Sequence, residues 1–146
     1  MPHPIPYLSF DGHCAEAMRF YERALEGRLV AVITNGQTPM AGQFPKEHHD
    51  RVMHACLELP DGGSLYAGDC PPQAGPYSGI QGLSIALNYA TVAEAERVFN
   101  ALAEGAQVSM PLQASFWARI FGMLIDRYGT PWIINGESLP TPSATA

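Results

Sequence analysis

Hydrophobic and polar residues follow two different rhythms in the first half of the chain. Between residues 14 and 25, apolar residues recur every three or four positions, which predicts an amphipathic helix with one buried stripe. That stripe consists of Cys14, Ala17, Met18, Tyr21, Ala24 and Leu25. The flanking segments change to alternation or to short apolar runs, which favour strands. We expect these strands at residues 5–10, 28–34, 52–59 and 64–69, with a long loop over residues 35–50.

The same order of patterns returns in the second half. Residues 92–104 have a helical stripe, and Thr91 with Glu94 forms a capping box in front of it. Strands are expected at residues 83–89, 106–112, 122–127 and 131–135. Residues 113–121 follow neither rhythm, so we predict a loop or a short helical turn there.

The two halves align with each other at an offset of 78 residues, which joins Gly27 to Gly105, the glycines expected to end the two helices. The shared order of strand, helix, strand and hairpin favours an internal repeat over chance similarity between two amphipathic helices. We therefore predict an α+β fold of two paired β-α-β-β-β modules whose sheets enclose a cavity. The modules would cover residues 1–70 and 83–137, with a linker at 71–82 and a flexible tail at 138–146.

Composition narrows the classes of partner. Apolar residues make up 47% of the chain, enough for a core, and charged residues only 15%. The net charge is −6 and the basic residues are scattered, so we expect no nucleic acid partner. Apolar runs are too short for a membrane span. Low charge and surplus apolar surface favour a homodimer.

The cysteines and the first residues of the chain indicate the cellular compartment in which we expect the protein. Cys14, Cys56 and Cys70 are an odd number of thiols without a C-x-x-C pair, which is untypical of a disulfide framework or a zinc knuckle. The first residues lack the charged and apolar regions of a signal peptide. Together these features lead us to expect a cytoplasmic protein.

Short motifs in both halves carry a family resemblance over about residues 4–137. The most specific run consists of Met110-Pro111-Leu112-Gln113, Phe116-Trp117, Phe121-Gly122, Asp126, Tyr128-Gly129, Pro131-Trp132 and Asn135. With these motifs the chain resembles the PhnB-like branch of the vicinal oxygen chelate superfamily, which includes glyoxalase I, bleomycin-resistance proteins and extradiol dioxygenases. The resemblance implies paired β-α-β-β-β modules around a ligand cavity.

The resemblance also implies where a metal would be bound. Metal-using members take His or Glu ligands from the first and last strands of each module. Here those places are taken by Tyr7, Tyr66, Ser84 and Ile133. Their side chains offer neither carboxylate nor imidazole, so we expect no metal at these positions and no cofactor.

His54 is the one histidine in the middle of a predicted strand. Three roles are open to it: a wall histidine hydrogen-bonded to a neighbour, a ligand-contacting residue of the cavity, or part of an unorthodox metal site. Cys56 lies on the same strand face as His54, about 6.5–7 Å along the strand, which is too far for a direct thiol–imidazole hydrogen bond. A buried structural thiol is the simpler interpretation of Cys56.

Polar and aromatic residues of the second half are the best candidates for ligand binding. Gln113 could orient a polar group, while Phe116 and Trp117 could form an apolar wall or instead a hydrophobic plug or dimer contact. Ser9 and Asn135 could add polar contacts. We predict a small-molecule-binding protein of the PhnB-like type with an unknown ligand, no assigned catalytic residue and no customary metal. The alternative is a metal-dependent lyase or dioxygenase with an unorthodox ligand set that includes His54, and a weaker third possibility is the methyltransferase label attached to this branch.

Overall fold

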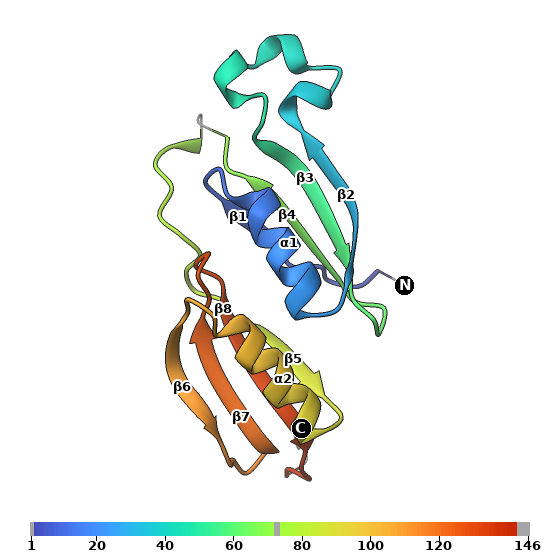
Figure 1. Ribbon diagram of the computed structural model, residues 1–146, viewed down its shortest axis with the longest axis vertical. Helices are drawn as coiled ribbons and strands as arrows, with labels where there is room; N and C mark the ends of the chain where they lie inside the picture. Colours follow the sequence, from blue (N-terminus) through green and yellow to red (C-terminus); the bar gives the residue numbers. More distant parts are fainter. Residues whose placement is uncertain (1, 72–73, 143–146) are drawn as a thin grey trace. The chain divides into compact units, whose positions relative to one another are not determined.

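The chain divides into two compact units, unit 1 from Met1 to Gln81 and unit 2 from Gly82 to Ala146. The structure, a computed structural model, describes residues 2–71 and 74–142. Each unit is a four-stranded mixed sheet with one α-helix on one face (Figure 1). The element order β-α-β-β-β occurs twice, which confirms the predicted α+β fold.

Unit 1 is built around the sheet order β1-β4-β3-β2. Its elements are β1 (Tyr7–Phe10), α1 (Cys14–Ala24), β2 (Arg28–Thr34), β3 (Val52–Glu58) and β4 (Ser64–Asp69). β1 and β4 run parallel, and the other neighbours are antiparallel. The expected loop between β2 and β3 contains three short 3-10 helices, η1 (Asn35–Gln37), η2 (Ala41–Gln43) and η3 (Lys46–His48).

Unit 2 repeats this arrangement with the order β5-β8-β7-β6. Its elements are β5 (Ile85–Tyr89), α2 (Val92–Leu102), β6 (Gln107–Gln113), β7 (Ala118–Ile125) and β8 (Pro131–Ser138). β5 and β8 are parallel, and β8, β7 and β6 are antiparallel neighbours. Both helices begin at positions related by the offset of 78 found in the sequence.

The core of each unit lies between the helix stripe and one face of the sheet. All predicted stripe residues of α1 are buried, and those of α2 are buried except Val92, which is half-buried. Alternate strand residues face the helices, including Leu8, Leu57 and Leu65 in unit 1 and Trp132 and Ile134 in unit 2. We call the opposite face of each sheet its open face.

Close packing of α2 depends on small residues in the strands beneath it. A Cβ atom at Gly136 would lie 2.7 Å from the Cβ atom of Ala95, and one at Gly122 would lie 2.6 Å from the Phe99 ring. Real Cβ atoms do not approach this closely, so larger residues there would push the helix away from the sheet.

Two predictions for the second half are wrong at their boundaries. Residues 118–121 are not a loop but the start of β7, because Ala118 pairs with Ser138 and Phe121 with Asn135. Likewise β8 continues past residue 135, since Gly136 pairs with Tyr89 of β5. Pairing with strands on both sides thus overrides the weak local pattern. Residues 143–146 of the predicted tail and residues 72–73 of the predicted linker lie outside the described residues.

In the described part of the chain, no helix has the length and apolar character required to cross a membrane.

Candidate functional site

The open face of unit 1 carries a cluster of aromatic rings. Strand register places Tyr7 opposite Tyr66, and Tyr66 opposite Cys56, so these side chains share one face. The His54 ring meets the Tyr66 ring edge-on at 4.9 Å between centroids and lies 5.9 Å from the Tyr7 ring. His54 is half-buried. It is therefore a wall residue of the open face with aromatic neighbours.

Tyr7 reaches across the sheet. Its hydroxyl donates a hydrogen bond of 3.1 Å to the carbonyl oxygen of Met53 in β3. Between them lies Gly68 of β4, where a Cβ atom would stand 2.9 Å from the Tyr7 hydroxyl oxygen. Partial burial raises the pKa of Tyr7, with Cys14 as a smaller electrostatic cause, so the phenol stays a neutral donor.

A pocket of about 350 Å³ opens beside this tyrosine, wholly within unit 1. Its lining residues come from β1, β3, β4, the connection between β2 and β3, and the two residues after β4. They are Tyr7, Ser9, Asn35, Phe44, Met53, Gly68, Asp69, Cys70 and Pro71. The volume lies near the lower end of the range for small-molecule sites.

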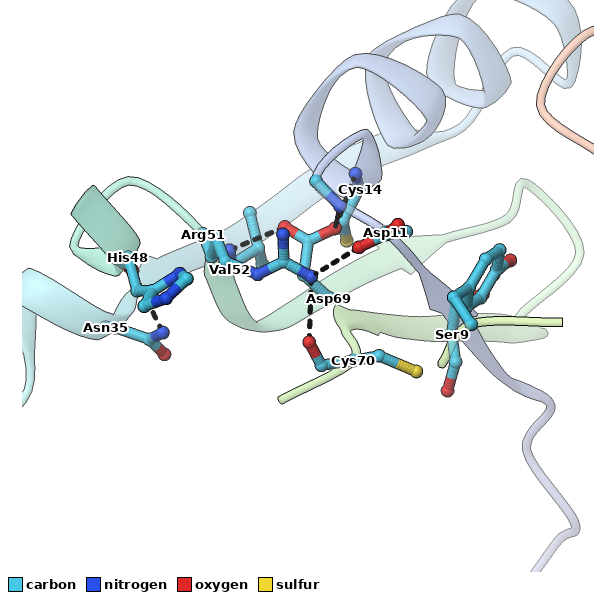
Figure 2. A network of polar contacts seen from close by, with 11 residues as sticks. Ser9, Asp11, Cys14, Asn35, His48, Arg51, Val52, Asp69 and Cys70 are labelled. Atoms are coloured by element: carbon cyan, nitrogen blue, oxygen red, sulfur yellow. Dashed lines mark hydrogen bonds and ion pairs between the residues drawn. The ribbon is translucent and has the colours of Figure 1, made fainter. Parts of the chain in front are cut away.

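The carboxylate of Asp69, at the end of β4, is engaged by backbone N–H groups of other segments (Figure 2). Its Oδ1 accepts hydrogen bonds from the backbone N–H groups of Gly12 and Cys14, at 2.8 and 3.1 Å. Its Oδ2 accepts one from Val52 at 2.8 Å. The carboxylate thus joins the start of α1 to β3 and β4, and it also suits the positive end of the helix dipole.

A second network lies beside the pocket. Arg51 donates to the Asp11 carboxylate at 3.0 Å and to the Cys70 carbonyl oxygen at 2.8 Å (Figure 2). The Tyr77 hydroxyl donates to the Ser9 carbonyl oxygen at 2.7 Å. These bonds tie residues after β4 back to β1.

The open face of unit 2 carries a chain of amide and indole groups. Trp117 Nε1 donates to Asn135 Oδ1 at 2.9 Å, and Asn135 Nδ2 donates to Asn88 Oδ1 at 2.8 Å. The Trp117 ring lies 4.5 Å from the Phe121 ring. Phe121 stands opposite both Asn135 and Gln113 in the strand register. This face is therefore partly aromatic and partly amide.

The connection between β6 and β7, residues 114–117, positions Trp117. The Ser115 hydroxyl accepts a hydrogen bond from the Ala118 N–H at 3.1 Å, and the Trp117 carbonyl oxygen accepts one from Leu139 at 2.8 Å. Phe116 packs edge-on against Trp117 at 5.0 Å and is 74% exposed. Trp117 is thereby held over the sheet, while Phe116 points its ring toward solvent.

The six residues predicted to bind ligand fall into two groups. Gln113, Phe116, Trp117 and Asn135 come together on one face of unit 2. Ser9 and His54 belong to unit 1, where Ser9 lines the pocket. A cavity shared by both groups stays a prediction.

Sequence reasoning missed Asn88, Asn35 and Phe44. Asn88 follows the buried strand residue Ile85 at a spacing that directs it to the open face, so its polar character inside a strand could have found it. Asn35 and Phe44 carried no such signal, because they lie in the long connection between β2 and β3.

The positions expected to hold a metal differ partly in register from the sequence prediction. Tyr7 and Tyr66 face each other across β1 and β4 as expected. Ser84 lies before β5, and the residue beside Ile133 is instead Ala86. The parallel pairing of β5 with β8 sets this register, which the sequence did not reveal.

The side chains now found at these positions do not fit a divalent metal. Tyrosine, alanine and isoleucine supply no carboxylate or imidazole to one ion. Across residues 2–71 and 74–142, no group of three His, Cys, Asp or Glu residues is arranged to hold a metal ion.

The three thiols differ in their surroundings. Burial, and secondarily the Asp69 carboxylate, raises the pKa of Cys14 to about 12. Burial also raises the pKa of Cys56, with a smaller contribution from Glu58. Neither thiol has the low pKa of a catalytic nucleophile.

Comparison with known proteins agrees with this architecture. Residues 5–134 match the model of the Glyoxalase/Bleomycin resistance protein/Dioxygenase superfamily. The chain is 31% identical over 138 residues to Protein YjdN of Escherichia coli K12, covering 89% of this chain and 92% of that protein.

Solved structures are also similar. The crystal structure of protein PA1353 from Pseudomonas aeruginosa is 46% identical with a TM-score of 0.83, covering 92% of this chain and 97% of that one. A PhnB protein from Bacillus cereus is 24% identical with a TM-score of 0.73, covering 92% and 98%, and shares the fold. With the family match spanning both repeated units, the chain belongs to the glyoxalase/bleomycin resistance protein/dioxygenase superfamily.

Proposed function

We propose that this protein binds a small molecule on its open sheet faces and does so without the metal customary in its superfamily. The observation that carries the proposal is the linked set Trp117, Asn135 and Asn88 on the open face of unit 2. Linked in this way, an indole and two amides present ring surface and oriented hydrogen-bonding groups side by side, as small-molecule sites do.

The geometry of this set suits recognition of a ring that carries a polar group. Asn135 has both ends of its amide engaged, so its orientation is fixed. Asn88 is exposed, and its amide nitrogen is accessible to an acceptor on a ligand. Trp117, whose ring is tilted against that of Phe121, offers the apolar surface against which a ring can pack.

The chemistry at the customary metal positions supports binding rather than metal-dependent catalysis. By the family resemblance, Tyr7, Tyr66 and Ile133 stand where His and Glu ligands are customary, and the strand register brings Ala86 beside Ile133. His54 is the remaining candidate ligand, and its closest ring neighbours are tyrosines. The competing hypothesis, a lyase or dioxygenase with a metal on His54, is decided by experiment.

The test uses protein purified without a metal-affinity tag. A library of small aromatic and amide-containing fragments is screened by ligand-observed NMR in the presence of EDTA. We expect hits in EDTA that weaken about tenfold in Trp117→Ala or Asn135→Ala, because these variants remove the ring surface and the fixed amide. Arg119→Ala, an exposed change on the same strand pair, is the matched control and should bind like wild type.

Elemental analysis distinguishes the metal-free binding protein from the metal-dependent enzyme. Stoichiometric zinc, nickel or iron that survives dialysis and leaves in His54→Ala would replace our proposal with the metal-dependent hypothesis. Hits that appear only after these metals are added, and vanish in the same variant, would do so too.

We also infer that the protein works as a homodimer. Large apolar side chains are exposed in both units, among them Tyr7, Ile33, Val108 and Phe116. Light scattering should give twice the chain mass of 15.8 kDa at micromolar concentration. A monomer mass across that range would contradict the inference.

A further inference from the structure

We propose that the pocket of unit 1 binds an uncharged, mainly apolar ring compound, and that Phe44 sets the size of ring it accepts. The pocket lies within one unit and is lined by none of the unit 2 residues on which the proposed function rests. It would therefore be a second binding element with its own specificity.

The floor of the pocket is the ring of Tyr7. The hydroxyl of Tyr7 is bound to the Met53 carbonyl oxygen, so the ring is held in one orientation across the sheet although about half of the residue is exposed. Gly68 makes this possible, because a Cβ atom there would lie 2.8 Å from the Met53 oxygen and 2.9 Å from the Tyr7 hydroxyl. The floor is thus a fixed aromatic surface of the kind that stacks with a planar ring.

One wall comes from the connection between β2 and β3, which holds Phe44. The His49 Nε2–H group donates to the carbonyl oxygens of Ala41 and Phe44, at 2.9 and 3.0 Å. The Phe44 N–H group in turn donates to Ala41 at 3.1 Å. These bonds fix the backbone of Phe44, so its side chain has a defined place in the lining.

Asn35, where the connection leaves β2, is also held by hydrogen bonds. Buried Asn35 donates from its side chain to the His48 carbonyl oxygen at 3.1 Å (Figure 2). Its backbone N–H group donates to Arg51 at 2.9 Å. A wall held at both its base and its tip is preorganised, which lowers the entropic cost of ligand binding.

The charges around the pocket point to a neutral ligand. Among the described residues, those that line the pocket include no lysine, arginine or histidine. Arg51, next to the pocket, is bound to Asp11 and to the Cys70 carbonyl oxygen. An anion would lose its hydration there without gaining a positive partner, and it would lie beside the negatively charged Asp69 carboxylate. Anion binding is therefore unfavourable.

A cationic ligand would be attracted by the Asp69 charge but would find few free acceptors to contact. Asp69 already accepts three backbone N–H groups, which occupy most of its hydrogen-bonding capacity. The remaining polar side chains of the lining that a ligand could contact are neutral, chiefly Ser9 and Cys70. With about 350 Å³ of space, the pocket suits a compound of one or two fused rings with one neutral polar group.

The test compares two probes that share a ring system and differ in charge, 2-naphthamide and 2-naphthoate. Calorimetric titration of the wild-type protein at pH 7 should show the amide binding about tenfold or more tightly than the carboxylate. Phe44→Ala should weaken amide binding about tenfold. Met40→Ala, which removes an exposed apolar side chain of the same connection outside the lining, is the matched control and should leave it unchanged.

A second measurement needs no variant. Cys70 lines the pocket, whereas Cys56 lies on the open face outside the lining. Saturating 2-naphthamide should slow alkylation of Cys70 by iodoacetamide severalfold, measured by peptide mass spectrometry, and leave Cys56 as the internal reference.

Either measurement can overturn the proposal. Equal or tighter binding of 2-naphthoate would refute the neutral ligand class. Unslowed alkylation of Cys70 by a bound probe would refute the pocket as its site. Loss of amide binding in Trp117→Ala but not in Phe44→Ala would place the probe on unit 2, which would support the proposed function and refute this inference.

Discussion

Unit 1 and unit 2 begin their helices in different ways although the helices occupy equivalent positions in the repeat. In unit 2, Thr91 accepts a hydrogen bond from the Glu94 N–H at 3.2 Å, a cap made within four residues. In unit 1, His13 stands at the equivalent position and makes no side-chain cap. Asp69, far along the sequence, instead accepts from the N–H group of Cys14, the first residue of the helix, and from that of Gly12 just before it. The N–H groups at a helix N-terminus need hydrogen-bond acceptors, which unit 2 supplies from a neighbouring residue and unit 1 from a distant strand.

The connections between the second and third strands of each unit differ as well. In unit 1, residues 35–51 form three 3-10 helices and one wall of a pocket. In unit 2, the much shorter residues 114–117 turn directly back and hold Trp117 over the sheet. The repeat thus keeps its sheet and helix and varies the connection, which is where binding residues commonly lie.

The largest effect should come from the two aspartates that act as hubs. Asp126 in unit 2 is buried and accepts from Tyr128, Thr130 and the Trp132 indole. We expect Asp126→Ala to lower the free energy of unfolding by about 3–4 kcal/mol, because buried donors lose a charged acceptor. Asp69→Ala, at a half-buried site, should cost about 2 kcal/mol. Urea unfolding at pH 7 measures both.

Amide hydrogen exchange tests whether Asp69 stabilises the start of α1. Asp69→Ala should speed exchange at the start of α1 and leave α2 unchanged, since the bond it removes lies there. If α1 keeps its protection, the long-range cap does not stabilise the helix, and the contrast between the units fails.

Alkaline pH should act on unit 1 first. Burial, the first cause in each case, raises the pKa of Cys14, Cys56, Tyr7 and Tyr77, all in unit 1. A raised pKa in the folded state means that the neutral group's stabilisation is complete below its ordinary pKa and is lost as pH rises toward the folded value. For Cys14 that window runs from about pH 9 to about pH 12.

The two units carry separate reporters for this prediction. All three thiols lie in unit 1 and both tryptophans in unit 2. As pH rises, reaction of Cys14 with a thiol reagent should precede any change in tryptophan fluorescence, and Cys14→Ala should reduce the loss of stability. A tryptophan change that comes first would contradict the assignment.

The smallest effect tests the helix caps directly. Thr91→Ala should lower the free energy of unfolding by about 1 kcal/mol because it removes the local cap. His13→Ala, the same substitution at the equivalent repeat position, should stay within about 0.5 kcal/mol. Thermal unfolding of the two variants side by side measures the difference. Equal losses would mean that His13 contributes in a way unrelated to capping.

Much of the fold could be predicted because local patterns and global structure agree. The stripes of both helices, the offset of the repeat and the hairpin at Asp61-Gly62-Gly63 all follow from period and turn chemistry. The start of β7 at Ala118 and the end of β8 at Ser138 could not be predicted, since only pairing between strands defines them.

Some residues of the candidate site could likewise be identified from the sequence, and others only from the tertiary structure. Gln113, Trp117 and Asn135 were found from their residue types, and strand register places them on one face. Asp69 lines the pocket, but three backbone N–H donors from distant segments engage its carboxylate. Nothing within its own strand indicates that role.

By itself, the sequence determined the elements and their order, because helical and strand periods, caps and turn residues act over a few positions. Through the family resemblance it also led us to expect Tyr7, Tyr66, Ser84 and Ile133 at the superfamily's metal positions, whereas the strand register brings Ala86 and not Ser84 beside Ile133. The tertiary structure alone decided which residues line the pocket with Phe44 and how α1 is capped. Those features join segments that are distant in sequence, and the strand register that brings them together depends on packing of the whole sheet.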